Sequence, residues 1–316
     1  MSFTTHSVKR VNDLVYATPN GDPLFADLYL PQNSQEKSPV IIWVHGGAWR
    51  FGDRKLSPDL SKYFTSKGFA MVSIDYRSSK KVTFPGQLYD VKTAIRWVKT
   101  IASEYGLDKN KIGLWGSSSG GHLAALAVAS GSNVLVGENV EYPEQTSDVQ
   151  AVVIGYAPID LLQIDEHRKP EGMVEEDPES FKPPKDTKST DPDSVEAFFI
   201  GAPILTCPNR VKAANPITYV KPGLPPFVIM HGLNDVAIPS HQSELLYKAL
   251  ADEGNEVSLY LIEKLGHGFL TRNHLDDNGY HLAEYRASHN KKEKIQEYYK
   301  LWIFDHIEDF FQEKLS

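Results

Sequence analysis

The chain alternates short apolar runs with longer segments that have helical character. Several runs are apolar at nearly every position, which is typical of strands buried on both faces of a parallel sheet. Segments 87–102, 122–129 and 240–254 have the apolar spacing or the Ala- and Leu-rich composition of helices. This order predicts an α/β fold with a doubly wound, mostly parallel sheet of eight strands. The predicted strands lie within 15–18, 24–31, 39–47, 68–76, 111–116, 149–158, 225–232 and 256–263.

A last helix is predicted near the carboxyl end of the chain, over residues 292–313. Apolar residues recur there at helical spacing and would face the sheet. This buried stripe would consist of Ile295, Tyr298, Tyr299, Trp302, Ile303 and Ile307.

Residues 160–216 interrupt the alternation, because no clear βα unit is visible between the sixth and seventh predicted strands. The part 172–194 is rich in Glu, Asp, Lys and Pro and predicts an exposed loop. The part 194–203 predicts a short helix with an apolar face. Long insertions in compact domains are more often functional than neutral. We therefore interpret 160–216 as a cap or lid within a single domain that spans 1–316.

Composition limits the classes of partner. The net charge of −8 over 316 residues provides no basic surface for nucleic acid. No apolar run is long enough to span a membrane, and residues 1–10 lack the apolar core of a signal peptide. A cytoplasmic location is therefore expected, unless a leader was removed. The single cysteine, Cys207, excludes an intramolecular disulfide. A homodimer is left open.

Three consecutive serines raise the question of a nucleophile. They stand where a strand ends and a helix begins, within Gly116-x-Ser118-x-Gly120. This is the pattern of a nucleophile elbow, a tight turn that lifts one serine hydroxyl clear of the backbone. Only Ser118 has glycine two residues before and two residues after it, so Ser118 is the candidate nucleophile.

Two later strand ends carry the residues that would activate this serine. Asp235 follows the strand at 225–232, and His267 follows the strand at 256–263. A serine hydroxyl needs an imidazole to take its proton, and the imidazole needs a carboxylate on its other nitrogen. The order Ser118, Asp235, His267 is the one expected for this arrangement. Asp160 is the rival acid and His231 the rival base.

A glycine-rich loop after the third strand, 45–49, is the candidate oxyanion hole. Backbone N–H groups in such a loop stabilise the negative charge that acyl transfer creates. We assign the N–H groups of Gly47 and Ala48, with that of Ser119 beside the nucleophile; Gly46 is the alternative donor. His45 is expected to brace the loop. Trp49 would either pack under the acyl site or belong to the core.

Together these stretches resemble the α/β-hydrolase superfamily. The resemblance is to the esterase/lipase branch related to hormone-sensitive lipase, and within it to bacterial feruloyl/acetyl xylan esterase-like proteins. It implies a serine hydrolase without cofactor or metal that acts on carboxylic esters. Many relatives have a third glycine where Ala48 stands, and often alanine where Ser119 stands. The matching stretches are 45–49, 75–77, 84–99, 105–126, 225–239 and 265–269.

The resemblance leaves the substrate open. The leading hypothesis is a carboxylesterase for short-chain or aryl esters, such as acetyl or feruloyl groups of plant polysaccharide, so the expected partner is a small-molecule or saccharide-linked ester. Amide hydrolysis on the same triad, as in an arylformamidase or peptidase, is the first alternative. A non-catalytic hydrolase-fold binding protein is the second. Residues 273–290 contain His274, His281 and His289 but no zinc-site spacing, and are expected to form a solvated, partly helical connection.

Overall fold

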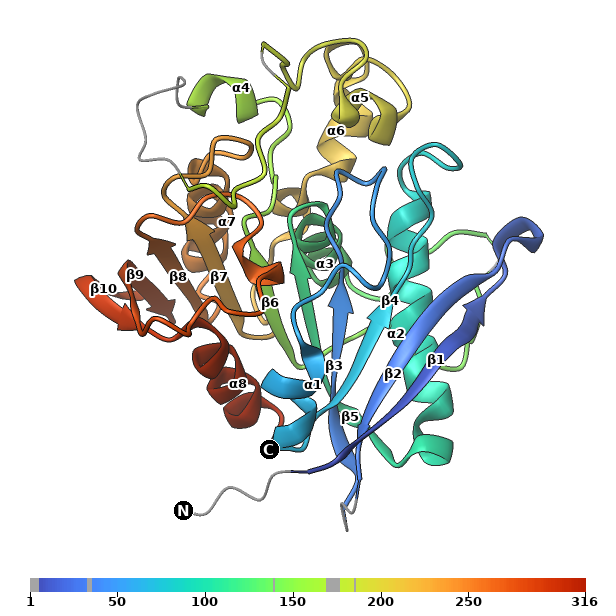
Figure 1. Cartoon of the computed structure of the whole chain (residues 1–316). Coiled ribbons are helices and arrows are strands. Elements are labelled where there is room, and N and C mark those ends of the chain that lie inside the picture. Colours follow the sequence, from blue (N-terminus) through green and yellow to red (C-terminus); the bar gives the residue numbers. More distant parts are fainter. Residues whose placement is uncertain (1–5, 33–35, 139, 169–176, 185) are drawn as a thin grey trace.

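The computed structural model describes residues 6–32, 36–138, 140–168, 177–184 and 186–316. Over these residues, ten strands form one sheet in the order β1-β2-β4-β3-β5-β6-β7-β8-β9-β10 (Figure 1). The strands from β4 to β8 in this order are mutually parallel. The pairs at both edges are antiparallel. The strands are β1 Val8–Ala17, β2 Leu24–Pro31, β3 Ser38–Val44, β4 Ala70–Ile74, β5 Leu107–Ser117, β6 Ala151–Gly155, β7 Phe227–Gly232, β8 Val257–Ile262, β9 His281–His289 and β10 Lys292–Leu301.

The eight predicted strands correspond to β1–β8, and the helices predicted over 87–102, 122–129, 240–254 and 194–203 correspond to α2, α3, α7 and α5. No helix in the described part of the chain is long and apolar enough to cross a membrane. The helices are α1 Leu60–Tyr63, α2 Gly86–Tyr105, α3 Ser119–Ser130, α4 Ile164–His167, α5 Val195–Ile200, α6 Pro208–Ala214, α7 His241–Asp252 and α8 Ile303–Lys314.

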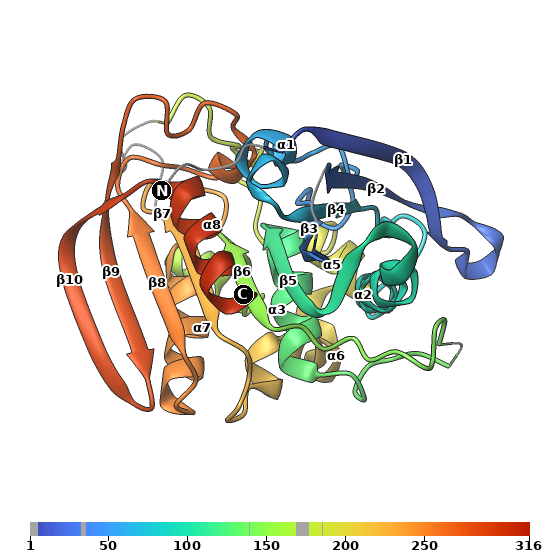
Figure 2. The same ribbon diagram turned by 90° about the horizontal axis from the view of Figure 1, so that it is seen from below.

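Helices cover both faces of the sheet, which explains the continuous apolar runs. Ile42 and Val44 of β3 pack in the same apolar cluster as residues of α2, α3 and α7. Ile41 and Trp43 face the opposite way and join a second cluster that includes α1 and α8. Figures 1 and 2 show these two helix layers on either side of the strands. Because successive side chains of a strand point to opposite faces, a strand covered on both sides must be apolar throughout.

The helix predicted over 292–313 is wrong in its first half. Residues Lys292–Leu301 form strand β10, and only Ile303–Lys314 is helical. Lys, Glu and Gln favour helices, so local propensity and spacing both indicated a helix there. Pairing with β9 decides otherwise, and most side chains of β10 are exposed. Asn290 and Lys291, both with positive φ, form the two-residue turn between β9 and β10.

The partly helical connection expected over 273–290 is also wrong, because its second half is strand β9. This strand continues the sheet antiparallel to β8. Together β9 and β10 extend the predicted eight strands to ten. Tyr285 and Tyr299 pack against Tyr260 of β8, so aromatic contacts between strands accompany the pairing.

The described part of the insertion 160–216 lies beyond the carboxyl ends of the parallel strands, where Figure 1 shows α4, α5 and α6. Residues 169–176 and 185 lie outside the described residues, so the exposed loop predicted over 172–194 is described only in part. Most of its described residues are at least partly exposed, whereas Asp177 and Ser189 are buried. The insertion thus contributes polar groups to the interior, which its composition did not indicate.

Candidate active site

Ser118 occupies the sharp turn between β5 and α3. Its backbone has φ 53° and ψ −127°, a conformation that L-residues rarely adopt. A Cβ on Gly116 would lie 2.4 Å from the carbonyl oxygen of Gly120, and a Cβ on Gly120 would lie 2.2 Å from that of Val44. The two glycines of the motif are therefore required by close backbone contacts at the turn.

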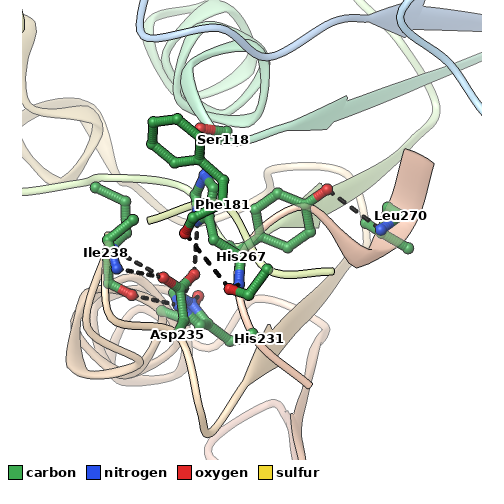
Figure 3. Close-up of polar contacts among 12 residues, drawn as sticks. Ser118, Phe181, His231, Asp235, Ile238, His267 and Leu270 are labelled. Carbon is green, nitrogen blue, oxygen red and sulfur yellow. Dashed lines mark hydrogen bonds and ion pairs between the residues drawn. The ribbon is translucent and has the colours of Figure 1, made fainter. Parts of the chain in front are cut away.

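The structure brings Ser118, His267 and Asp235 together in one line of hydrogen bonds (Figure 3). The Oγ atom of Ser118 lies 2.9 Å from Nε2 of His267. Nδ1 of His267 lies 2.7 Å from Oδ2 of Asp235. Asp235 is fully enclosed, whereas Ser118 is partly exposed, so the hydroxyl is the end of the line that a small molecule can reach.

The carboxylate of Asp235 has partners for both of its oxygens. Oδ1 accepts hydrogen bonds from the N–H groups of Ala237 and Ile238, each at 2.9 Å. Oδ2 faces His267 and also lies 3.3 Å from Nε2 of His231. Burial alone would raise the pKa of Asp235, but the charges and hydrogen bonds of His267 and His231 outweigh it and hold the pKa well below its ordinary value. Asp235 is thus ionised beside the imidazole.

The rival acid, Asp160, and the rival base, His231, have hydrogen-bond partners other than Ser118. The carboxylate of Asp160 accepts from the N–H of Leu162 and the side-chain amide of Gln163, which makes it a turn residue. His231 is buried behind Asp235, with its Nδ1 2.7 Å from the hydroxyl of Ser243. His231 therefore supports the acid and has no access to Ser118.

The loop after β3 presents backbone N–H groups beside the nucleophile turn. Gly47 has φ 118°, and a Cβ there would lie 2.0 Å from the carbonyl oxygen of Phe51. Ala48 also has a positive φ, 53°, despite its methyl group. Among the described residues, none accepts a hydrogen bond from the N–H of Gly47, Ala48 or Ser119. These three groups are available to a ligand. The missing side chain of Gly46 leaves room for Ser118, whose Cβ would lie 3.0 Å from a Cβ there.

One tyrosine that sequence reasoning did not single out joins the glycine loop to the nucleophile turn. The hydroxyl of Tyr76 donates to the carbonyl of His45 at 3.1 Å and lies 3.2 Å from the hydroxyl of Ser119. The rings of Tyr76 and His45 stack with centroids 4.4 Å apart. Burial lowers the pKa of His45, which favours the neutral form. His45 is thus placed to brace the loop, as the sequence suggested.

Trp49 lies in the packed interior, where it connects three parts of the site. Its ring stacks on Phe199 of α5 with centroids 4.4 Å apart. Its indole N–H donates to Nδ1 of His122 at 3.2 Å, and Nε2 of His122 lies 2.8 Å from the carbonyl oxygen of Ala214. This contact joins the glycine loop to helix α3 and to the insertion. Burial lowers the pKa of His122 to about 4.

The insertion also holds the loop that carries His267. The hydroxyl of Ser180 accepts from the backbone N–H of His267 at 2.7 Å, and the N–H of Phe181 donates to the carbonyl of His267 at 3.0 Å. The carboxylate of Asp177 accepts from the N–H of Gly266 and from Arg272, both at 2.7 Å. We call residues 177–181 the histidine clasp.

Gly266 is the residue whose type could have indicated the clasp. A Cβ on Gly266 would lie 2.2 Å from the hydroxyl oxygen of Ser180, so only glycine permits this approach. Burial alone would raise the pKa of Asp177, but its hydrogen bonds to Arg272 and the backbone outweigh it and lower the pKa. Nothing in the acidic composition around Asp177 distinguished this one buried carboxylate from its exposed neighbours.

The histidines near the carboxyl end do not gather into a metal-binding group. Among the described residues, no cluster of three or more His, Cys, Asp or Glu side chains has a suitable arrangement. His274 contacts Glu179, while His281 contacts Asp276 and the carbonyl of Leu275. His289 ends strand β9.

The sequence of this chain matches a known protein family. The model of the BD-FAE family matches residues 26–250, which is more than half of the chain and includes Ser118, Asp235 and the glycine loop. The chain belongs to the BD-FAE family. The fold of this BD-FAE chain is that of α/β-hydrolases, as the order of strands and helices predicted.

Relatives of the BD-FAE chain are named as esterases. Esterase LipQ of Mycobacterium tuberculosis is 34% identical over 219 residues, which cover 69% of this chain and 47% of that protein. The chain spans about half the length of the curated relatives it matches.

Solved structures resemble the chain over more of its length. A truncated carbohydrate esterase from gut microbiota has a TM-score of 0.75 and 27% identity, and the match covers 99% of this chain and 98% of that one. A propionate-bound esterase of Thermogutta terrifontis has a TM-score of 0.61 and 25% identity, covering 85% and 87%.

Proposed function

We propose that this protein is a serine carboxylesterase. The observation that carries the proposal is the hydrogen-bonded line from Ser118 through His267 to the buried Asp235. Gly46 approaches Ser118 closely, and the next two residues of its loop, together with Ser119, have backbone N–H groups without acceptors among the described residues. A nucleophile, a base, a group that orients the base and a site for the oxyanion are the parts that acyl transfer requires. Relatives named as esterases support the same reaction.

The reaction follows from these parts. His267 takes the proton of Ser118 through Nε2 while Oγ attacks the ester carbonyl carbon. The N–H groups of Gly47, Ala48 and Ser119 hold the resulting oxyanion, with Gly46 as the alternative donor. His267 then gives the proton to the leaving alcohol oxygen as the carbon–oxygen bond breaks. Water, deprotonated by His267, hydrolyses the acyl-serine and restores the hydroxyl. Asp235 fixes the tautomer of His267 and stabilises its charged form.

The proposed substrates are short-chain or aryl esters, including acetyl or feruloyl groups carried by saccharides. The likeness to a carbohydrate esterase over almost the whole chain supports the saccharide, and the likeness to a propionate-bound esterase supports a short acyl group. We also propose that residues 160–216 act as a cap, because helices α4–α6 lie beyond the strand ends that carry the triad (Figure 1).

Hydrolysis of a substrate panel tests the proposal. The panel contains p-nitrophenyl acetate, butyrate and octanoate, methyl ferulate, acetylated xylan and N-formylkynurenine. Wild type should hydrolyse one or more of the esters and bind a fluorophosphonate covalently, whereas Ser118→Ala should do neither. Ser132→Ala is the matched control, since Ser132 lies just beyond the far end of α3, about 18 Å along the helix from Ser118.

The other outcomes would redirect the proposal. Hydrolysis of N-formylkynurenine without any ester would favour amide chemistry on the same triad. A folded wild type that hydrolyses nothing and resists the fluorophosphonate would favour a non-catalytic binding protein.

A further inference from the structure

The imidazole of His267 lies between two aromatic rings that differ in exposure. Tyr156 packs edge-on against one side with ring centroids 4.8 Å apart, and only 1% of its surface is exposed. Phe181 of the histidine clasp lies on another side with centroids 6.0 Å apart, and 58% of its surface is exposed. The interior closes the tyrosine side, so the side with Phe181 is the one open to solvent.

Backbone hydrogen bonds place the ring of Phe181. The N–H of Phe181 donates to the carbonyl of His267, and the preceding residue, Ser180, accepts from the N–H of His267. The backbone of Phe181 is therefore hydrogen-bonded to the residue whose imidazole the phenyl ring faces. This hydrogen bond places the ring, although the ring buries little of its own surface. Among the exposed large apolar side chains of the described residues, Phe181 is the one with a ring contact to the triad.

The position of the leaving alcohol during ester hydrolysis indicates what the exposed ring of Phe181 contacts. To protonate the leaving alcohol, Nε2 of His267 must come within about 2.6–3.2 Å of its oxygen. The alcohol part of an ester therefore begins beside the imidazole, while the carbonyl oxygen points to the N–H groups of Gly47, Ala48 and Ser119. The surface that the alcohol meets on the open side of the imidazole is the ring of Phe181.

We propose that Phe181 is the binding surface for the alcohol part of the substrate and selects alcohols with a flat apolar face. Phenols have such a face, and so does a pyranose ring, whose axial C–H groups form one apolar side. An exposed aromatic ring gains contact area against either, and a two-carbon alcohol is too small to cover it. This inference rests on the proposed esterase function and names the alcohol side of its specificity.

The test holds the acyl group constant and varies the alcohol. Ethyl acetate, phenyl acetate and a mono-acetylated methyl β-xylopyranoside are hydrolysed by wild type and by Phe181→Ala. We expect kcat/KM to fall about tenfold for the phenyl and xyloside esters, mainly through KM, and less than about twofold for ethyl acetate. The backbone N–H of residue 181 is unchanged in this variant, so the bond to His267 is retained.

Two control variants separate the ring from general effects. Phe181→Tyr keeps an aromatic face and should keep the selectivity of wild type. Tyr298→Ala removes a more exposed ring from β10, five strands from β5 in the sheet, and should change none of the three rates.

The remaining outcomes each decide a different question. An equal loss on all three esters in Phe181→Ala would overturn the inference, because the ring would then act on the imidazole rather than on the alcohol. No loss on any ester would overturn it too. If wild type hydrolyses none of the three, the proposed function itself fails and the inference fails with it.

Discussion

The hydroxyl oxygen of Ser180 lies 2.7 Å from the backbone nitrogen of His267, so a residue of the acidic insertion holds the loop of the candidate base. Asp177 adds a second attachment one residue earlier, at Gly266. A loop beyond a strand end has few partners of its own, and its backbone groups need acceptors and donors from elsewhere. The insertion therefore takes part in positioning the imidazole of His267.

Removing the hydroxyl of the clasp should lower turnover more than binding. In Ser180→Ala, we expect kcat to fall about tenfold to a hundredfold, because small displacements of a catalytic group are costly. KM should stay within about twofold, since the N–H groups of the glycine loop are untouched. The measurement is steady-state hydrolysis of p-nitrophenyl acetate together with its pH profile, which should change shape if the imidazole becomes mobile.

Ser66→Ala is the control for this substitution. Its hydroxyl also has a backbone partner, but as a donor, to the carbonyl of Lys62 at 2.8 Å, just after α1. Equal losses of kcat in the two variants would mean that the clasp does not position the imidazole. The same conclusion would follow if Ser180→Ala lowered the melting temperature and left kcat unchanged.

Asp235→Asn should show that the buried carboxylate orients the imidazole. An amide can donate as well as accept, so it permits the wrong tautomer of His267, and kcat should fall by about 10⁴ as in a comparable serine hydrolase substitution. The rival substitution Asp160→Asn should leave kcat close to wild type, because Asp160 only caps a turn. A larger loss in Asp160→Asn than in Asp235→Asn would reverse the assignment of the acid.

Gly47→Ala should disable the oxyanion loop. The new Cβ would lie 2.0 Å from the carbonyl oxygen of Phe51, so the loop must move and its N–H groups with it. Loss of oxyanion donors of this kind costs about 10² to 10³ in kcat. Gly223→Ala is a matched control, because Gly223 also has a positive φ but nothing within 4 Å of the added Cβ. It should cost about 1 kcal/mol of stability and leave kcat unchanged; a similar kcat loss in both variants would refute the assignment.

His122 should make the fold less stable in mild acid. Its neutral ring accepts from Trp49 through Nδ1 and donates to Ala214 through Nε2, so a second proton would face the indole N–H. The folded pKa of about 4 lies below the ordinary 6.5, so the unfolded chain binds the proton first as pH falls. This contribution is fully present above pH 6.5 and is lost between pH 6.5 and about 4. At pH 5 the loss is about 2 kcal/mol.

The substitution His122→Gln isolates this contribution. Glutamine can accept from the indole and donate to the carbonyl, but it does not titrate. Urea unfolding of both proteins between pH 5 and 8 should show a smaller loss of unfolding free energy in the variant at low pH. If the unfolding free energies of wild type and His122→Gln changed equally with pH, His122 would not be the source of the loss of stability in acid.

The sequence determined the parts of the fold and of the site that depend on local pattern. The apolar runs in β3–β8 follow from burial on both faces of the sheet. Gly116 and Gly120 are visible in the sequence because a tight turn tolerates nothing larger. Ser118, Asp235 and His267 could be chosen because parallel strands end at the same edge, so residues far apart in sequence meet there.

The other features depend on partners distant in sequence, so they became visible in the folded chain alone. Residues 292–301 have helical propensity, yet pairing with β9 makes them a strand. Asp177 resembles the exposed acidic residues around it, and only the approach of Gly266 and Arg272 makes its burial favourable. Such contacts cannot be read from composition or spacing. Both describe the type of each residue and its neighbours in sequence, whereas these contacts are made by neighbours in space.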